Sequence, residues 1–308
     1  MKGKISIHWF KRDLRLTDNE ALSAACADHN PLMLLYILEP SLEQDNHYSD
    51  RHFTFIKESL HDLNKALVTF DTRILCAYGE VEDVFTKLQS LYQIENVYSL
   101  QETGIGLTYQ RDLRFARYCQ NHGIKWTEYQ QNGVIRGISN RNNWKRSWYS
   151  YMKNGYRKNV LQGASFVFTM NESFMGLDEF SLHTGKHSRQ KGGRTIALRY
   201  AHSFFEERIT NYSRNISKPE ASRTGCSRLS PYLAWGNLSI REVYQEAMRQ
   251  KGNGLAKSPF NAFMSRLRWH CHFIQKFEME PRMEFQAVNK GYLDLKQEKN
   301  PAYLEAWP

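Results

Sequence analysis

The first 135 residues alternate short apolar runs with amphipathic segments. Residues 5–10 are predicted to form a strand, and residues 31–38 are the continuous apolar run expected of a strand buried on both faces of a parallel sheet. Between them, Thr17-x-x-Glu20 has the form of a capping box and predicts the start of a helix. Residues 51–69 repeat apolar side chains on a helical stripe. The pattern so far predicts a strand, a helix, a strand and a helix.

The same alternation continues to residue 129. Strands are predicted at 74–78, 96–100 and 124–129, and helices at 81–91 and 109–121. Five strands separated by helices predict a doubly wound parallel sheet with right-handed crossovers. We therefore expect residues 1–135 to form a Rossmann-like α/β domain.

The pattern changes after Arg136. Residues 137–190 show no clean period of 2 or 3.6, and a stretch of this length without regular elements is unusual inside one domain. We therefore expect 136–190 to be a connector between domains. The remainder, 191–308, is helical in character and shows no strand alternation, so it predicts an all-α second domain. Its helices are expected at 195–210, 231–249 and 259–279.

Hydropathy and cysteine content restrict the cellular setting. The mean hydropathy is −0.64, and no apolar run approaches the roughly 20 residues of a membrane span. The N-terminal segment has no long apolar core and no small-residue cleavage site, so it predicts a strand and no signal peptide. Five cysteines are dispersed without C-x-x-C spacing. This pattern is typical of reduced thiols and predicts a cytoplasmic protein.

The net charge of +10 is unevenly distributed. Residues 1–135 carry 14 Lys and Arg against 18 Asp and Glu, a net charge of −4. Residues 136–308 carry 28 against 14, a net charge of +14. A basic surface attracts polyanions through counterion release, and 13% aromatic residues offer surfaces for base stacking. The charge pattern favours a nucleic-acid partner over a merely solvated basic surface.

Residues 224–239, TGCSRLSPYLAWGNLS, combine hydroxyl residues, a glycine and an arginine with a proline-containing apolar stretch. Backbone N–H groups, hydroxyls and a guanidinium are the donors that a diphosphate needs. Pro231 suits the first turn of a following helix. The stretch predicts either a phosphate-binding loop that leads into a helix or an ordinary capped helix start. The residues alone leave both interpretations open.

Three stretches resemble signatures of the photolyase/cryptochrome family. Residues 224–239 resemble its flavin-diphosphate loop, and residues 8–22, HWFKRDLRLTDNEAL, resemble its opening signature R-D-L-R-x-x-D-N-x-A-L. The third stretch resembles the end of the antenna domain in some bacterial branches; it consists of Q-E-T-G at 101–104, Y-x-R-D at 109–112 and Q-x-G-V-I-R at 131–136. The likeness covers essentially the whole chain, which is identified as a deoxyribodipyrimidine photolyase-like member of the family.

The resemblance implies an FAD site in the second domain. Cys226 stands where the family usually has threonine; its thiol is the weaker donor, while its backbone amide is unchanged. Tyr212 matches a tyrosine that lines the same pocket, although the residue alone is also compatible with a core or surface tyrosine. The flavin-binding residues implied by the resemblance are Tyr212, Cys226, Ser227, Arg228, Leu229, Ser230, Phe263, Arg266 and His270.

Residues 263–273, FMSRLRWHCHF, resemble a family helix that in repair photolyases commonly reads W-x-N-E-x-x-W-R-E-F-Y. Arg266 and His270 stand at the positions of the glutamate that contacts the pyrimidine dimer and of the arginine that helps to hold the flavin. Phe263 replaces the first tryptophan, and Trp269 is retained. The resemblance implies DNA binding by Arg266 and Trp269, on an aromatic and basic face suited to phosphate or a flipped base. The missing carboxylate weakens the expectation of pyrimidine-dimer specificity.

Two pairs of residues bear on further sites, a metal site and an antenna pocket. His270 and His272 are two positions apart on a predicted helix, so their side chains diverge by about 200° and no metal site is predicted. Glu102 and Asp112 are candidates for lining an antenna pocket. The family's antenna chromophores are of folate or deazaflavin type, and the sequence does not select between them.

The last residues, NPAYLEAWP at 300–308, resemble the family motif N-P-x-x-x-x-A-W, which a G-x-T-G-x-P-x-V-D segment normally follows. The later helices, which carry residues around the flavin ring and the tryptophans that relay electrons, are not in the sequence. We therefore expect a C-terminally truncated, incomplete FAD-binding domain with uncovered apolar helix faces. The alternative is a second chain that completes the domain of an otherwise monomeric protein.

The resemblance implies a DNA photolyase, a carbon–carbon lyase in which photoexcited reduced FAD donates an electron that splits a pyrimidine dimer in damaged DNA. Consistent with cofactor chemistry, no nucleophile triad, P-loop or G-x-G-x-x-G motif is visible. Two alternatives stay open. One is a cryptochrome-like blue-light sensor, and the other is a non-enzymatic α/β antenna-domain protein without flavin.

Overall fold

The computed structural model describes residues 2–156, 161–168, 174, 177, 190–252, 257–296 and 298–306. Its sheet has five parallel strands: β1 Lys4–Phe10, β2 Leu32–Leu38, β3 Leu75–Tyr78, β4 Gln93–Leu100 and β5 Lys125–Tyr129. Their order is β3-β2-β1-β4-β5. Because the strand order reverses between β1 and β4, the predicted doubly wound α/β fold is confirmed.

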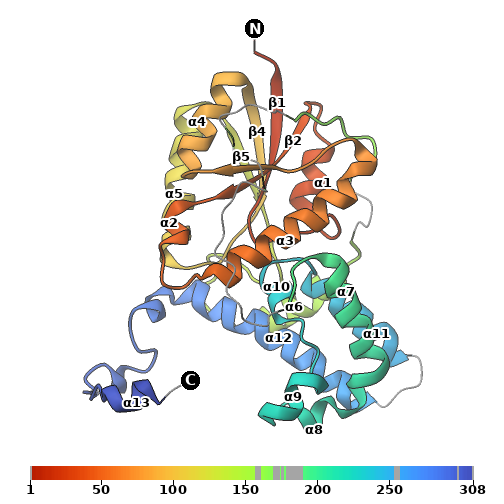
Figure 1. The fold of residues 1–308 in the computed structure, drawn as a ribbon, viewed down its shortest axis with the longest axis vertical. Helices are drawn as coiled ribbons and strands as arrows, with labels where there is room; N and C mark the ends of the chain where they lie inside the picture. The colour runs from red at the N-terminus through yellow and green to blue at the C-terminus, as the bar shows by residue number, and fades with distance from the viewer. Residues whose placement is uncertain are drawn as a thin grey trace.

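Helices cover both faces of this sheet (Figure 1). Helices α1 Glu20–Cys26 and α3 Asp50–Leu67 lie on one face, and α4 Val81–Leu91 and α5 Gly106–Asn121 lie on the other. The short elements α2 Pro40–Glu43 and η1 Val68–Phe70 flank α3. Side chains of β2 alternate between the two cores: Leu34 packs with the α1 and α3 side, and Leu35 with the α4 and α5 side. A strand buried on both faces must be apolar at every position, which is why 31–38 is a continuous apolar run.

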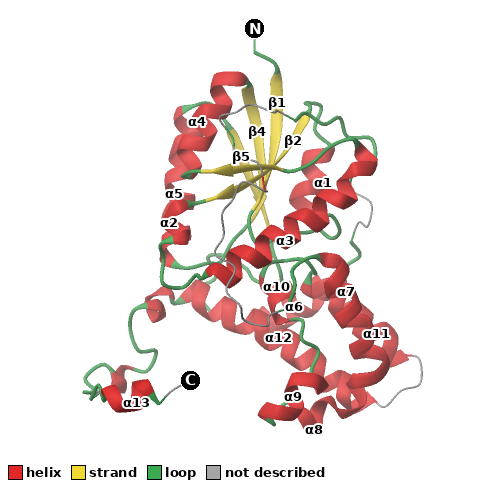
Figure 2. Cartoon of the chain, in the orientation of Figure 1, coloured by secondary structure: helices red, strands yellow, loops and turns green. Residues whose placement is uncertain are grey.

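The remaining described elements are helical and lie beyond the carboxyl ends of the strands (Figure 2). They are α6 Trp144–Lys153, α7 Arg194–Ser203, η3 Phe204–Arg208, η4 Ile209–Asn211, α8 Tyr212–Asn215, α9 Pro219–Gly225, α10 Ser230–Ala234, α11 Ile240–Gly252, α12 Lys257–Met279, η5 Pro281–Glu284, η6 Lys290–Tyr292 and α13 Pro301–Glu305. The turn η3 is a π-helix.

One apolar core joins the two parts of the chain. The cluster under α1 and α3 continues through the α6 tryptophans into Phe204, Tyr232 and Phe263 of the helical part. The buried members of the cluster under α4 and α5 all come from the sheet domain, and Val167 and Phe168 pack against it. The helical part is thus packed against one face of the α/β domain, while the boundaries 1–135, 136–190 and 191–308 stay predictions.

Two expected helix boundaries are wrong. The capping box at Thr17 is not formed: α1 begins at Glu20, and its N-cap is Asn19, whose side chain accepts a hydrogen bond from the backbone of Leu22 (3.0 Å). The helix predicted at 231–249 is two helices, because Gly236 has a φ of +70° and ends the first of them. Sequence periodicity missed this turn because apolar residues continue through it.

The expectation that 137–190 lacks a regular period is also wrong in its first part. Trp144, Trp148 and Met152, each four residues from the next, bury one face of α6. Two of these three residues are tryptophans among polar neighbours, so the stripe was short and easily overlooked. Most of the rest of the predicted connector lies outside the described residues.

The C-terminal elements extend away from the body of the protein toward α13 (Figure 1). Phe285 is 79% exposed, and Tyr303 of α13 is 76% exposed. Within the described ranges, none of the helices combines the length and the apolar character needed to cross a membrane.

Candidate functional site

The two longest sequence signatures meet in space, although they lie about two hundred residues apart in the chain. The turn after α10 packs on the loop that leaves β1: the backbone amide of Leu14 donates to the Trp235 carbonyl (3.1 Å). The Asn237 side chain donates to the Leu14 carbonyl (3.3 Å). A Cβ atom at Gly236 would overlap the carbonyl oxygen of Arg12, so only glycine allows this close approach. The signatures therefore form one interface.

Charged side chains of the first signature reinforce this interface. Arg15 donates to the carbonyls of Gly236 (3.2 Å) and Asp18 (3.1 Å). Asp18 accepts from the Ser239 hydroxyl (2.5 Å) and forms a buried ion pair with Arg241 of α11. These charges are removed from water, so their pairing fixes the geometry between β1 and the start of α11. The sequence signature R-D-L-R-x-x-D-N is thus a docking surface for the segment after the candidate phosphate loop.

The candidate phosphate loop connects α9 to α10. Gly225 ends α9 at a place where a Cβ atom would overlap the Asn215 side chain. Arg228 has a φ of +62°, and Leu229 follows in the right-handed helical region. A left-handed residue followed by a right-handed one turns successive backbone N–H groups toward one concave side, a geometry that binds anions. Pro231 lies in the first turn of α10, as predicted.

Donors in this loop are available. Among the described residues, the backbone amides of Ser227 and Arg228 donate no hydrogen bond. The side chains of Arg228 and Ser230 are exposed. Leu229 is 1% exposed and belongs to the core, so its contribution is limited to its backbone. The loop therefore offers amides, a hydroxyl and a guanidinium, the donor set predicted for a diphosphate.

A cluster of three aromatic rings lies behind the loop. Tyr212 and Phe263 have ring centroids 5.6 Å apart, and Phe204 lies 5.5 Å from Tyr212 and 4.8 Å from Phe263. Burial raises the pKa of Tyr212 to about 12, with Cys226 adding to the rise and Arg266 opposing it. Tyr212 is therefore neutral and lies within electrostatic range of both the loop and α12. Sequence reasoning placed Tyr212 and Phe263 in one site but missed Phe204.

The α12 residues divide between the interior and the surface. Arg266 lies over the Trp269 ring, 4.8 Å from its centroid, and Trp269 is 47% exposed. Phe273 continues this exposed face, 5.9 Å from Trp269. Burial lowers the pKa of His270 to about 4, so its imidazole is neutral at pH 7. His270 consequently cannot supply the permanent positive charge of the arginine that the family commonly has at this position.

A second group of charges lies at the carboxyl ends of the strands. Arg111 pairs with Glu39 (2.8 Å), Glu102 (2.7 Å) and Asp112 (2.9 Å), and Lys11 also reaches Asp112 (3.3 Å). The side chains that fill this region leave a cavity of only about 30 Å³. The two candidate antenna residues, Glu102 and Asp112, are thus brought together by Arg111 and already engaged with cations.

Burial and charge act differently on the two buried glutamates. Burial raises the pKa of Glu39 to about 7 against the opposing effect of Arg111. Burial also favours the neutral form of Glu102, but the cations Arg111, Arg12 and Lys11 outweigh it and hold its pKa at about 2. Of these two glutamates, Glu102 is therefore the one that stays ionised.

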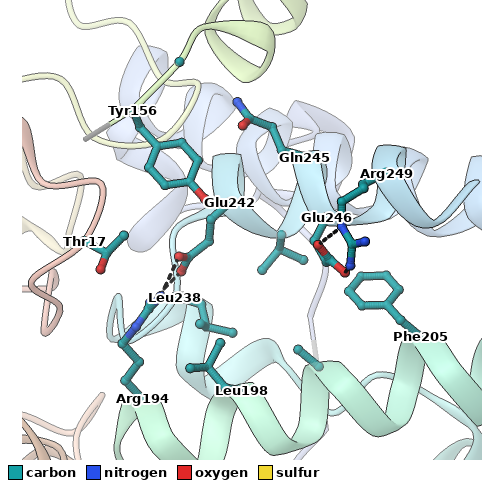
Figure 3. Close-up of a pocket in the computed structure, with 13 residues that line it drawn as sticks. Thr17, Tyr156, Arg194, Leu198, Phe205, Leu238, Glu242, Gln245, Glu246 and Arg249 are labelled. Carbon is teal, nitrogen blue, oxygen red and sulfur yellow. Dashed lines mark hydrogen bonds and ion pairs between the residues drawn. The ribbon is translucent and has the colours of Figure 1, made fainter. Parts of the chain in front are cut away.

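A cavity of about 740 Å³ lies between α7 and α11 (Figure 3). Leu198, Phe205 and Leu238 form apolar parts of its wall, and Arg194 pairs with Glu242 at its edge (2.9 Å). None of the predicted flavin or DNA residues lines it. Within the described ranges, no group of three or more His, Cys, Asp or Glu side chains could hold a metal ion.

The fold and the loop together define a class: a doubly wound α/β domain joined to a helical domain that carries a candidate anion-binding turn. A family model described as DNA photolyase matches residues 6–162. The chain therefore belongs to the DNA photolyase family, which contains photolyases and cryptochromes.

Individual relatives agree with this assignment. Cryptochrome-2 of Gallus gallus is 25% identical over 98% of this chain and 56% of its own length. Cryptochrome DASH of Solanum lycopersicum is 22% identical over 99% of this chain and 60% of its own length. The chain thus spans little more than half the length of these curated relatives.

Solved structures show the same fold. The class III photolyase of Agrobacterium tumefaciens has a TM-score of 0.85 at 18% identity, with 100% of this chain and 66% of that chain covered. The photolyase of Sulfolobus tokodaii, described with two FAD molecules, has a TM-score of 0.78 at 23% identity and covers 98% of this chain and 66% of its own.

Proposed function

We propose that this chain is the antenna domain and the first part of the FAD-binding domain of a photolyase-type flavoprotein. The observation that carries the proposal is the turn at Ser227–Leu229, where the amides of Ser227 and Arg228 donate to none of the described residues and the Arg228 side chain is exposed. The opening signature contacts the other end of α10, at Trp235 and Gly236, and so supports the helix that follows this turn. Family membership supplies FAD as the anion's identity.

The chain's own residues would bind and orient the flavin. The amides of Ser227 and Arg228 and the hydroxyl of Ser230 are placed to donate to the diphosphate, and the Arg228 guanidinium neutralises its charge. Tyr212 and Phe263 form an apolar, uncharged wall behind the loop. Bound and reduced FAD would supply the photochemistry, the transfer of an electron to damaged DNA.

DNA is the proposed substrate, on the strength of the basic helical part. The charge of +14 on residues 136–308 favours a polyanion. Arg266 and Trp269 lie on the exposed face of α12, where a guanidinium and an indole can engage a phosphate and a base. We propose a repair lyase on damaged DNA. Five cysteines without a disulfide among the described residues are compatible with the proposed cytoplasmic location.

A blue-light sensor is the second candidate, and Arg266 favours it. A cation stands where repair photolyases commonly have the glutamate that contacts the dimer. Such a sensor would bind flavin and signal to protein partners instead of repairing DNA. The antenna chromophore, of folate or deazaflavin type, belongs to either proposal. So does a second chain that completes the helical domain.

An absorption spectrum of the purified protein tests the shared part of both proposals. We expect flavin bands near roughly 370 and 450 nm after incubation with FAD. A protein that shows no such bands and no FAD affinity would be an α/β antenna-domain protein without flavin. Repair of a dimer-containing oligonucleotide under blue light then separates the lyase from the sensor, since only the lyase restores the pyrimidines.

A further inference from the structure

Arg208, the last residue of the π-turn η3, makes an unusual set of backbone contacts. Its guanidinium donates to the Cys226 carbonyl in the candidate phosphate loop. It also donates to the Thr224 carbonyl at the end of α9 (3.5 Å). It also donates to the Tyr200 carbonyl (2.8 Å) and the Ser203 hydroxyl (2.9 Å) in α7. The Arg208 side chain therefore connects the loop to α7.

These contacts determine the direction of the loop's amides. In a planar trans peptide, the carbonyl of one residue and the N–H of the next point in opposite directions. When Arg208 binds the Cys226 carbonyl, it turns the Ser227 N–H away from itself, toward the other side of the loop. Gln190 holds the next peptide: it donates to the Arg228 carbonyl (2.8 Å), while the following N–H, that of Leu229, donates to the Ser227 hydroxyl (3.4 Å).

The same turn also positions the aromatic wall. Arg208 lies over the Phe204 ring, 5.6 Å from its centroid. Phe204 in turn contacts both Tyr212 and Phe263. A π-turn inserts one residue into a helix and is often found at functional sites. Here it brings Arg208 to the loop and Phe204 to the wall from a single element.

We propose that Arg208 is a positioning residue of the flavin-diphosphate loop: it orients the Ser227 amide from behind through the Cys226 carbonyl, without contacting the cofactor. This inference rests on the proposed function, FAD binding. The plainer role, closure of the C-terminal end of α9, would make Arg208 a stability residue without a specific effect on the diphosphate.

The experiment compares FAD with riboflavin, which lacks the diphosphate. We expect Arg208→Ala to weaken FAD binding at least about tenfold, equivalent to about 1.4 kcal/mol, while riboflavin binding changes less than about twofold. Arg208→Lys should recover part of the loss, since a lysine keeps the charge but cannot span four acceptors. Arg249→Ala is the matched control, because Arg249 is exposed and, in the part of the chain that the structure describes, its ion pair is with Glu246 of its own helix.

Hydrogen exchange on the ligand-free protein supplies an independent readout. We expect faster exchange in Arg208→Ala at the amides of Cys226 and Leu229, which donate to the Ser222 carbonyl and the Ser227 hydroxyl in the folded protein. An unchanged FAD-to-riboflavin ratio in the folded variant would overturn the inference, and so would unchanged exchange in the loop. If the wild-type protein binds no FAD, the proposed function fails, and the exchange data then decide separately whether Arg208 orders the loop.

Discussion

Charged side chains are buried and paired at the carboxyl ends of the strands, whereas they are exposed on the outer face of α12. Arg111, at the strand ends, is buried and meets three carboxylates. Arg266, on α12, is exposed and lies over the half-exposed ring of Trp269. Paired buried charges fix a structure because either partner alone is costly, whereas exposed cations beside aromatic rings remain available to a ligand. The first region is thus fixed by pairing within the α/β domain, whereas the charges of the second stay exposed.

Breaking a buried pair should produce the largest effect. We expect Arg241→Met to lower the free energy of unfolding by about 3–5 kcal/mol, because Asp18 would keep a buried charge without its cation. Urea denaturation measures the loss. Arg249→Met on the same helix removes an exposed pair with Glu246 and should cost less than about 1 kcal/mol. Equal losses of unfolding free energy in the two variants would contradict the contrast between buried paired charges and exposed charges.

The glycine between the two signatures is the next most sensitive position. Gly236→Ala should lower the free energy of unfolding by about 3 kcal/mol, because the added methyl overlaps the Arg12 carbonyl and φ is +70°. Gly137→Ala separates the two causes, since Gly137 has a φ of +73° but open space around it. We expect it to cost only about 1 kcal/mol. If both variants lose the same amount, the signatures are not in close contact.

How much of this could be predicted depends on where the partner of each residue lies in the sequence. The sheet was predictable because a strand such as β2 is a continuous apolar run, a pattern that can be recognised in the local sequence. The helix break at Gly236 was not, because its cause is the carbonyl of Arg12 in a distant segment. The N-cap was misplaced for a different reason: Thr17 and Asn19 are both good caps, and tertiary contacts of Asp18 select the second.

The candidate site shows the same division. The loop at 226–230 and Tyr212 were accessible through family signatures, because those residues form recognisable strings. Arg208 was not, since in the sequence it closes the charged run Glu206-Glu207-Arg208, which looks like a solvated helix face. Only the fold reveals that its guanidinium reaches the loop carbonyls. The burial of His270, and hence its neutrality, likewise depends on packing that periodicity does not reveal.

The lowered pKa of His270, a partly buried residue of α12, predicts that acid destabilises the helical part. Burial lowers the pKa of His270 from 6.5 to about 4, so the unfolded chain takes up a proton below pH 6.5 while the folded chain does not until about pH 4. The contribution to stability is complete above pH 6.5 and is lost as the pH falls to 4. We expect His270→Gln to remove about 2 kcal/mol of this pH dependence, measured as unfolding free energy at pH 4.5 and 7.5. A variant with the wild-type pH slope would show that another group, such as the fully buried His8, dominates.

The smallest effect on stability is expected at Trp269, and this variant tests the exposed face of α12. Trp269→Ala should change the free energy of unfolding by no more than about 0.5 kcal/mol, because the indole is already 47% exposed. It should nevertheless weaken binding of a single-stranded oligonucleotide about fivefold to tenfold, since a stacked base is worth about 1–3 kcal/mol. Fluorescence anisotropy at fixed salt measures this affinity. Tyr303→Ala on α13 removes an even more exposed aromatic ring that lies away from α12. This variant should leave the affinity for the oligonucleotide unchanged. A large loss of stability in Trp269→Ala, or equal effects of both variants on DNA, would mean that the face of α12 does not bind DNA as we propose.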